Sequence, residues 1–259
     1  MSEPVRPPER RLFGRRRSHK LRPTRRALMA EFERRVALPG FEICWDPETG
    51  APSRLPGAAR PERGGLDLQE VFPRAQEVWL EIGFGGGEHL VHQAAAHREV
   101  GFIGCEHYVD GVAKLLSGLD AQKLSNVRVH PHDARDVLDA CPDAALGRVF
   151  LLYPDPWPKR RHWKRRFVNA DSLDALSRVM ARGAQLRIAS DIPSYISHCL
   201  AVLQSRRAGG QRDFRWTAER AEDWRRPWSD WPGTKYERKA LEAGRTPCYL
   251  TFERTEHRV

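Results

Sequence analysis

Short apolar runs alternate with amphipathic stretches along the chain after residue 77. The apolar runs are rich in valine, leucine and phenylalanine, which is typical of buried strands. They predict strands at residues 78–82, 100–105, 127–130, 149–153, 185–189, 214–216 and 249–252. Apolar residues at helical spacing predict helices between these runs, near residues 87–97, 108–120, 164–181 and 192–206.

Strands that alternate with helices favour a mainly parallel sheet with helices on both faces. The last two predicted strands have no full helix between them, so we expect an antiparallel strand at one edge. The predicted fold class is therefore α/β and Rossmann-like, with the seven strands in one sheet. Ligands of such open sheets bind at the carboxyl ends of the strands, where the candidate site residues fall.

The part of the chain before residue 77 follows a different pattern. Thr24 is a candidate N-cap for a helix that would end at Leu38, before Pro39 and Gly40. Residues 46–65 contain four prolines and predict an irregular connection. No internal repeat is evident, so we expect one domain over residues 27–259.

Residues 1–26 form a strongly basic segment, with ten lysines and arginines and only two acidic residues. Such a segment contains too little apolar surface to fold by itself, so we expect a disordered arm. It is either a solubilising tail or an arm that adds affinity for a polyanion by releasing counterions.

Composition restricts the compartment and the kinds of site. No segment approaches the roughly 18 consecutive apolar residues of a membrane span, and the N-terminus lacks the apolar stretch of a secretion signal. We therefore expect a cytoplasmic protein without membrane contact. The five cysteines include no C-x-x-C pair, which argues against a zinc knuckle, and their odd number argues against a complete disulfide framework.

A glycine-rich turn at residues 81–87 follows the first of these strands and opens a helix. Gly83 and Gly85 let the backbone turn tightly and approach a ligand closely. Glu88 stands where a dinucleotide fingerprint would have its third glycine, which disfavours a pyrophosphate there. Glu81 instead suits a cationic ligand such as S-adenosylmethionine (SAM), which has an amino group and a sulfonium but no phosphate.

Acidic residues also follow the next two strands. Glu106 lies 19 residues after Gly87, close to the roughly 20-residue spacing of an acid that binds ribose hydroxyls. Asp133 follows the third strand, where it would contact the adenine or its amino group. Acids at three successive strand ends favour SAM over the alternatives, which are a nicotinamide or flavin cofactor and glycines that only shape a loop.

Asp155 follows the fourth strand, between two prolines and close to Trp157. It is the candidate catalytic residue, because a methyl donor and its acceptor would meet at this strand end. The alternative is that Asp155 only makes a turn. Trp157 is either a stacking platform for an extruded base or a residue of the core.

Six lysines and arginines lie within residues 159–166, with His162 and Trp163 between them. Such a run fits the binding of phosphates, and the alternative is a solvated helix start. Asp191 follows the fifth strand at the same edge. Residues 224–239 mix aromatic side chains with five cations, and the structural alternative for them is an edge loop packed by its tryptophans.

Two pairs of histidines raise the question of a metal site. His130 and His132 alternate before Asp133, but no further ligand is suggested by spacing, so we predict no metal. His89 and His92 lie on one face of a predicted helix and are expected to be solvated or capped.

Taken in order, six motifs closely resemble those of the bacterial single-chain tRNA (guanine-N7)-methyltransferase family. They are E-I-G-F-G-G-G, G-C-E-H, H-D-A, Y-P-D-P-W-P-K-R-R-H-x-K-R-R, S-D and T-K-Y-E, between residues 81 and 237. The fourth and last are specific to the family, whereas many SAM enzymes share the glycine turn. The resemblance covers roughly residues 66–254 and implies a class I SAM-dependent methyltransferase fold. It also implies methylation of N7 of guanine 46 in the tRNA variable loop.

The resemblance implies a role for each matching residue, with Asp155 as the catalytic one. The cofactor would be SAM, bound by Glu81, Gly83, Gly85, Glu106, Asp133 and Asp155. The substrate would contact Lys159, Asp191, Thr234, Lys235, Tyr236 and Glu237. RNA would contact Arg161, His162, Trp163, Lys164, Arg165 and Arg166. Tyr236 stands where the family commonly has phenylalanine, and we expect its hydroxyl to matter little.

The expected partner is tRNA, with no obligatory protein partner. Two alternatives stay open. One is a SAM-dependent methyltransferase that acts on another RNA base or on a ribose. The other is a non-catalytic RNA-binding protein on the same scaffold, which the acids at strand ends argue against, because a pure binder gains nothing from carboxylates that face RNA.

Overall fold

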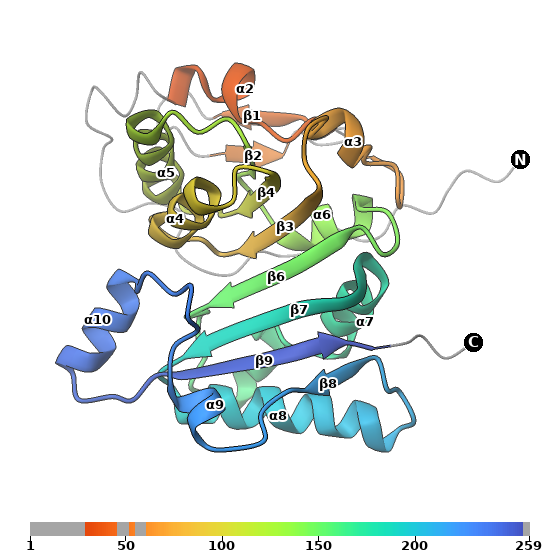
Figure 1. Cartoon of the computed structure of the whole chain (residues 1–259), viewed down its shortest axis with the longest axis vertical. Helices are drawn as coiled ribbons and strands as arrows, with labels where there is room; N and C mark the ends of the chain where they lie inside the picture. Colours follow the sequence, from red (N-terminus) through yellow and green to blue (C-terminus); the bar gives the residue numbers. More distant parts are fainter. Residues whose placement is uncertain (1–28, 46–51, 55–60, 256–259) are drawn as a thin grey trace, which may run out of the picture.

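The computed structural model describes residues 29–45, 52–54 and 61–255, and the basic arm and Thr24 lie outside these ranges. Within them, seven strands form one sheet in the order β5-β4-β3-β6-β7-β9-β8 (Figure 1). The strands are β3 (Glu77–Ile82), β4 (Val100–Cys105), β5 (Val127–His130), β6 (Leu146–Leu152), β7 (Met180–Ser190), β8 (Phe214–Trp216) and β9 (Cys248–Arg254).

The first five of these strands are parallel, and β9 runs antiparallel between β7 and β8. The predicted α/β class with a mainly parallel sheet and an antiparallel edge is therefore confirmed. The chain passes outward from β3 to β5 and then returns to β6, beside β3. The strand order thus reverses between β3 and β6, and the crevice at such a switch point is where open α/β sheets bind ligands.

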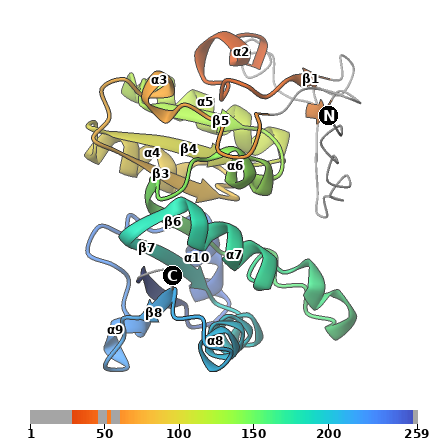
Figure 2. The ribbon, with the colours of Figure 1, turned by 90° about the vertical axis from the view of Figure 1, so that its right-hand side faces the viewer.

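Helices cover both faces of the sheet, as the alternating pattern predicts (Figures 1 and 2). One face packs against α6 (Ala134–Ala140), α7 (Ala170–Val179) and α8 (Pro193–Ala208). The other packs against α4 (Glu88–Ala96) and α5 (Val109–Gln122). The remaining short helices are α2 (Phe32–Arg35), α3 (Leu68–Val71), the 3-10 helix η1 (Arg160–Arg165), α9 (Glu222–Arg225) and α10 (Lys235–Glu242).

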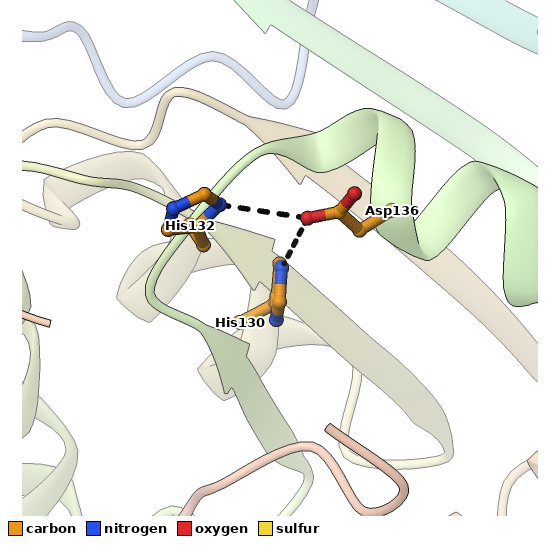
Figure 3. A group of neighbouring side chains, drawn as sticks. All are labelled: His130, His132 and Asp136. Carbon is orange, nitrogen blue, oxygen red and sulfur yellow. Dashed lines mark hydrogen bonds and ion pairs between the residues drawn. The ribbon is translucent and has the colours of Figure 1, made fainter. Parts of the chain in front are cut away.

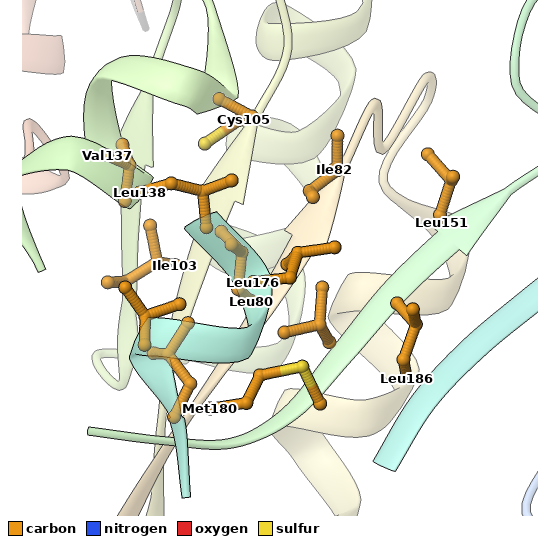
Figure 4. Packing of buried hydrophobic residues seen from close by; sticks show 14 of the residues in the cluster. Leu80, Ile82, Ile103, Cys105, Val137, Leu138, Leu151, Leu176, Met180 and Leu186 are labelled. Carbon is orange, nitrogen blue, oxygen red and sulfur yellow. The ribbon is translucent and has the colours of Figure 1, made fainter. Parts of the chain in front are cut away.

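Strand β3 shows how side chains that alternate along a strand contribute to the hydrophobic clusters on both faces of the sheet. Leu80 and Ile82 point into the cluster under α6 and α7, beside Leu176 (Figure 4). Trp79, between them in sequence, belongs to the cluster under α4 and α5. Because successive side chains of a strand alternate between faces, a strand that is buried on both sides reads as one continuous apolar run.

The predicted helix over 164–181 is wrong at both ends. The segment starts as η1, and α7 begins only at Ala170, because Asn169 and Ser172 form a capping box there. At its other end the helix stops at Val179, and Met180 starts the long strand β7. Helices α6 and α10 were not predicted. In the described part of the predicted 24–38 helix, α2 covers only Phe32–Arg35, so the helix ends before the predicted Leu38, and Ala37 bridges to Val129 of β5.

The N-terminal and connecting segments add little beyond this core. Residues 43–45 form β1 (Ile43–Trp45), which pairs antiparallel with β2 (Pro52–Arg54) inside the predicted irregular connection. None of the described helices has both the length and the apolar character needed to cross a bilayer.

Candidate active site

A cavity of about 540 Å³ lies at the carboxyl ends of the strands, beside the switch point. It brings together five of the residues that the sequence predicts for the cofactor and for catalysis. They come from the turns after β3, β4, β5 and β6, and are Gly83, Gly85, Glu106, Asp133 and Asp155. Further lining residues come from η1 and α10, and are Lys164, Arg165, Lys235, Tyr236 and Lys239. Figure 1 shows α10 beside the arrowheads of β6 and β7.

The glycine turn is shaped for close approach. Gly83 and Gly85 have φ angles of 72° and 58°, in the left-handed region that side chains disfavour. The Gly85 N–H donates to Glu106 Oε2 at 2.8 Å, so the turn and the acid after β4 are held together. The two elements therefore form one rigid edge of the cavity.

Glu106 is buried and oriented by the backbone. Its second oxygen, Oε1, accepts a hydrogen bond from the Tyr108 N–H at 2.9 Å. Burial raises the pKa of the Glu106 carboxyl, although the nearby His107 and the backbone donors partly offset the rise. A carboxylate has about four lone-pair sites, so Glu106 can still accept a hydrogen bond from a ligand hydroxyl such as one of a ribose.

Asp133 also has a fixed orientation. Its side chain caps α6 by accepting from the Arg135 N–H, and the Arg135 guanidinium donates to both of its oxygens at 2.6–3.0 Å. Arg135 itself lines the cavity and was not predicted. A carboxylate beside a guanidinium can accept a hydrogen bond from an adenine amino group without carrying the full negative charge into the site.

The turn before α6 is braced by His130, His132 and Asp136 (Figure 3). One oxygen of the buried Asp136 lies 3.3 Å from His130 Nε2 and 3.5 Å from His132 Nδ1. Sequence spacing suggested no third residue here, because α6 was not predicted and Asp136 lies on its first turn. Among the described residues this is the group whose donor atoms would suit a metal ion. Its contacts support a simpler role, which is to hold the turn that carries Asp133.

Glu81 lies away from the cavity wall. It is buried at the end of β3, and its Oε2 atom is 2.7 Å from Nδ1 of His89 on α4. The expectation that His89 is solvated is therefore wrong, since only 2% of it is exposed. The pair fixes the start of α4 against the sheet, and the cofactor contact of Glu81 stays a prediction.

The loop after β6 presents Asp155 to the cavity. Asp155 is exposed and lines the wall, while Tyr153 and Trp157 on either side have φ angles of 49° and 42°. Left-handed conformations of non-glycine residues cost of order 1–3 kcal/mol each and collect at functional sites. Trp157 is half-buried, lines the cavity and lies outside both hydrophobic clusters, with the Arg165 guanidinium 4.9 Å from its ring.

Arg166 holds this loop by a hydrogen bond to its backbone. Only 1% of it is exposed, and its guanidinium donates to the Pro156 carbonyl and to the Ser194 carbonyl, both at 2.9 Å. Arg166 also lines the cavity, but its donors are used inside the protein, so its contact with RNA stays a prediction. The signal in the sequence was ambiguous because Arg166 ends a run of exposed cations.

The rest of the basic run remains on the surface. Lys159, Arg160, Arg161 and Lys164 are exposed, whereas His162, Trp163 and Arg165 are half-buried. Lys164 and Arg165 reach the cavity wall, and Lys159 does not. Cations therefore surround the opening on the side of Asp155.

Residues 226–237, which we call the strap, are pinned to the sheet. Asp230 accepts from Arg187 at 2.7 Å and lies 3.3 Å from the Arg148 guanidinium. Partial burial opposes ionisation of Asp230, but these two arginines hold its pKa below the ordinary value. Trp228 donates to Thr251 at 2.8 Å and packs edge-on against Trp231. The sequence alternative of a loop packed by its tryptophans is thus correct for this part.

The end of the strap starts α10. Thr234 caps the helix by accepting from the Glu237 N–H at 3.1 Å, and the Glu237 carboxylate accepts from Trp231 and Tyr249. These two predicted substrate residues are thus engaged within the protein, whereas Lys235 and Tyr236 line the cavity. Asp191 accepts from Arg245 and lies outside the cavity wall. Lys239, one turn after Lys235, was missed because α10 was not predicted.

Comparison with known proteins gives a consistent result. The model of a family described as "Putative methyltransferase" matches residues 75–250. A protein of Ruegeria sp. (strain TM1040) is 53% identical over 209 residues, which is 79% of each chain. One of Jannaschia sp. (strain CCS1) is 45% identical over 247 residues, or 95% of each chain. Both relatives carry the name tRNA (guanine-N(7)-)-methyltransferase.

The crystal structure of the 16S rRNA methyltransferase KamB has a similar fold. It superposes with a TM-score of 0.51 at 14% sequence identity, over 86% of this chain and 99% of that one. At this identity the likeness concerns the fold alone. It confirms the Rossmann-like class I methyltransferase fold that the sequence motifs imply.

Proposed function

This chain belongs to the tRNA (guanine-N7)-methyltransferase family, and from that premise we propose that it transfers a methyl group from SAM to N7 of a guanine in tRNA, guanine 46 of the variable loop. The main support is one cavity at the switch point. Its walls combine the oriented acids Glu106 and Asp133, the exposed Asp155 and a basic rim.

The residues of the cavity fit SAM chemically. Glu106 keeps lone pairs for ribose hydroxyls, Asp133 can accept from an adenine amino group, and the glycine turn admits a ligand close to the backbone. The start of α6 in this wall is capped by the carboxylate of Asp133, and Glu88 opens the neighbouring helix α4, so neither helix start suits a phosphate. When bound, SAM would supply an electrophilic methyl group, whose bond to sulfur breaks as the bond to N7 forms.

Methyl transfer to guanine N7 requires little acid or base catalysis from the protein. Guanine N7 has an in-plane lone pair and carries no proton, so no base is needed to create the nucleophile. Asp155 would accept a hydrogen bond from the guanine edge or from the amino group of the donor, and would stabilise the positive charge that moves onto the purine. Its exposed position on the cavity wall suits that role.

The remaining contacts follow from position. Arg161, Lys164 and Arg165 would bind RNA phosphates at the rim, with His162 and Trp163 between them. Lys159, Asp191 and Lys235 are proposed to meet the substrate, while Thr234 and Glu237 would act by shaping the start of α10. A single domain over 27–259, a basic RNA-binding arm over 1–26, a cytoplasmic location and independence from a protein partner stay predictions.

The decisive experiment measures methyl transfer from labelled SAM to an unmodified tRNA transcript. We expect incorporation into wild-type transcript and none into a transcript with adenine in place of guanine 46. Cleavage of the product by aniline would map the methyl group to N7. Incorporation that persists in the adenine transcript would support a different RNA methyltransferase, and SAM-independent tRNA binding without incorporation would support a binding protein.

A further inference from the structure

The Tyr236 side chain lies over the glycine turn. A Cβ atom added to Gly85 would be 3.1 Å from Tyr236 Cε2 and 3.7 Å from its hydroxyl oxygen. Tyr236 is 43% exposed, and Lys235 Nζ lies 4.8 Å from the ring centroid. The aromatic ring of Tyr236 thus packs over the backbone of the glycine turn at Gly85, whereas Gly83, two residues earlier in the same cavity wall, has open space above it.

The ring also lies among the acids of the cavity. Burial raises the pKa of the Tyr236 hydroxyl, and the charges of Glu106, Glu88 and Asp155 raise it further. Glu106 is hydrogen-bonded to the same turn, through the Gly85 N–H. The ring and the Glu106 carboxylate therefore both contact Gly85, and Glu106 is the acid proposed to bind the ribose hydroxyls.

The backbone of Tyr236 is held from both sides. Thr234 caps the helix two residues before it, and the carboxylate of the next residue, Glu237, accepts from Trp231 and Tyr249. The Tyr236 side chain is left with its own rotamers as the main freedom. An aromatic side chain on a fixed backbone can pack against a small ligand at low entropic cost.

We propose that Tyr236 is a cofactor-binding residue whose ring packs against the ribose end of SAM above Gly85, rather than against the guanine. The inference rests on the proposed function, because it takes SAM as the ligand of the cavity. It assigns the T-K-Y-E segment to two tasks, with Lys235 toward the substrate and Tyr236 toward the cofactor.

The test measures binding of SAM and of S-adenosylhomocysteine by calorimetry, using the full chain without tRNA. We expect Tyr236→Ala to weaken both about 10-fold and Tyr236→Phe to bind nearly as wild type, because the ring makes the contact. Leu241→Ala is the matched control, since Leu241 is an exposed apolar residue of α10 that does not line this cavity. Thermal unfolding of each variant checks that the fold is intact.

The outcomes separate the two proposals. If Tyr236→Ala binds SAM as tightly as the wild type does and its KM for tRNA is raised, the cofactor role is overturned in favour of guanine stacking. Equal losses in Tyr236→Phe and Tyr236→Ala would also overturn it, because the hydroxyl and not the ring would then matter. Failure of the wild type to bind SAM would overturn the proposed function, and this inference with it.

Discussion

Asp155 lies in a loop whose backbone conformation is energetically unfavourable and is held by contacts with nearby residues. Tyr153 and Trp157 both have positive φ angles, and the loop between them is tied down through the Pro156 carbonyl by Arg166. The local sequence alone would relax to a lower-energy turn, since each left-handed residue costs of order 1–3 kcal/mol. The tertiary contacts of single residues therefore fix where the carboxylate points.

Replacement of Asp155 tests its role in the chemical step. We expect Asp155→Ala and Asp155→Asn to lower kcat at least about 100-fold, the loss seen when one preorganised polar group is removed. Tyr153 and Trp157 keep their positions in both variants, so tRNA affinity should change little. Single-turnover methyl transfer to tRNA is the measurement, and near-normal turnover in Asp155→Ala would show that the assignment is wrong.

Arg166 and Arg161 form a matched pair, one buried and one exposed. Arg166→Ala should lower the free energy of unfolding by about 3 kcal/mol, because it leaves the Pro156 and Ser194 carbonyls without their charged donor. Arg161→Ala should leave stability unchanged and weaken RNA binding instead. Urea unfolding and RNA binding of both variants measure this, and equal stability of the two would contradict it.

The raised pKa of Glu106 gives a pH dependence to cofactor binding. A protonated Glu106 loses its charge and an acceptor, so SAM affinity should fall as pH is lowered from neutrality, and the fall should begin above the ordinary glutamate range of about 4.3. Glu106→Gln should bind SAM weakly and with little pH dependence below neutrality. Calorimetry at several pH values is the measurement, and a flat wild-type profile would refute the role of Glu106.

At the scale of elements, the strap is held against the sheet by side-chain contacts. Its residue Asp230 ties it to β6 and β7 through Arg148 and Arg187, and the Asp230 carbonyl accepts from Gln93 of α4. Arg148 in turn lies 4.0 Å from the Trp79 ring of β3. The strap is thus attached to elements on both sides of the switch point before any RNA arrives.

Removal of the Asp230 carboxylate should loosen the strap. Asp230→Ala leaves two partly buried arginines without their acid, so we expect a loss of about 2 kcal/mol in stability. It should also lower kcat/KM about 10- to 100-fold, because α10 is no longer held in place. Hydrogen exchange over residues 226–237 and steady-state kinetics are the measurements, with the exposed Ser229→Ala as control. Unchanged exchange in Asp230→Ala would contradict the anchoring role.

At the scale of the whole molecule, cations gather at the carboxyl edge of the sheet beside the cavity. Neutralising Arg161, Lys164 and Arg165 together should reduce the salt slope of RNA binding by about 2 to 3, because each phosphate contact releases counterions. Arg74, Arg98 and Arg182 are exposed cations near the starts of β3, β4 and β7, at the opposite edge. Their joint replacement is the control and should leave the slope unchanged. A similar reduction of the salt slope in both triple variants would show that RNA binds to positive charge anywhere on the surface rather than at the carboxyl edge of the sheet.

Strands were predictable because their signal is local. Each of β3, β4 and β5 was predicted to within one residue, since β3 and β4 consist mostly of buried apolar residues and β5 alternates valines with polar residues. The turns that follow these three strands were placed with them, and they hold Gly85, Glu106 and Asp133, while the predicted strand at 149–153 placed Asp155 after β6. Helix α10 was not predictable in the same way, since only one of its residues, Ala240, is buried and its start depends on a cap by Thr234.

The amino-acid sequence alone specifies the fold class, the edge of the sheet at which ligands bind and the residue types of the site. Periodicity and strand ends depend on neighbouring residues, so they can be read from the sequence. Which side chains face inward or outward is a property of packing between distant segments. Arg166 turned away from solvent, Glu81 paired with His89, and Tyr236 came to lie over Gly85, more than 100 residues before it in the chain. Such pairings follow from the closeness of elements in space, and so they arise only when the sheet is assembled.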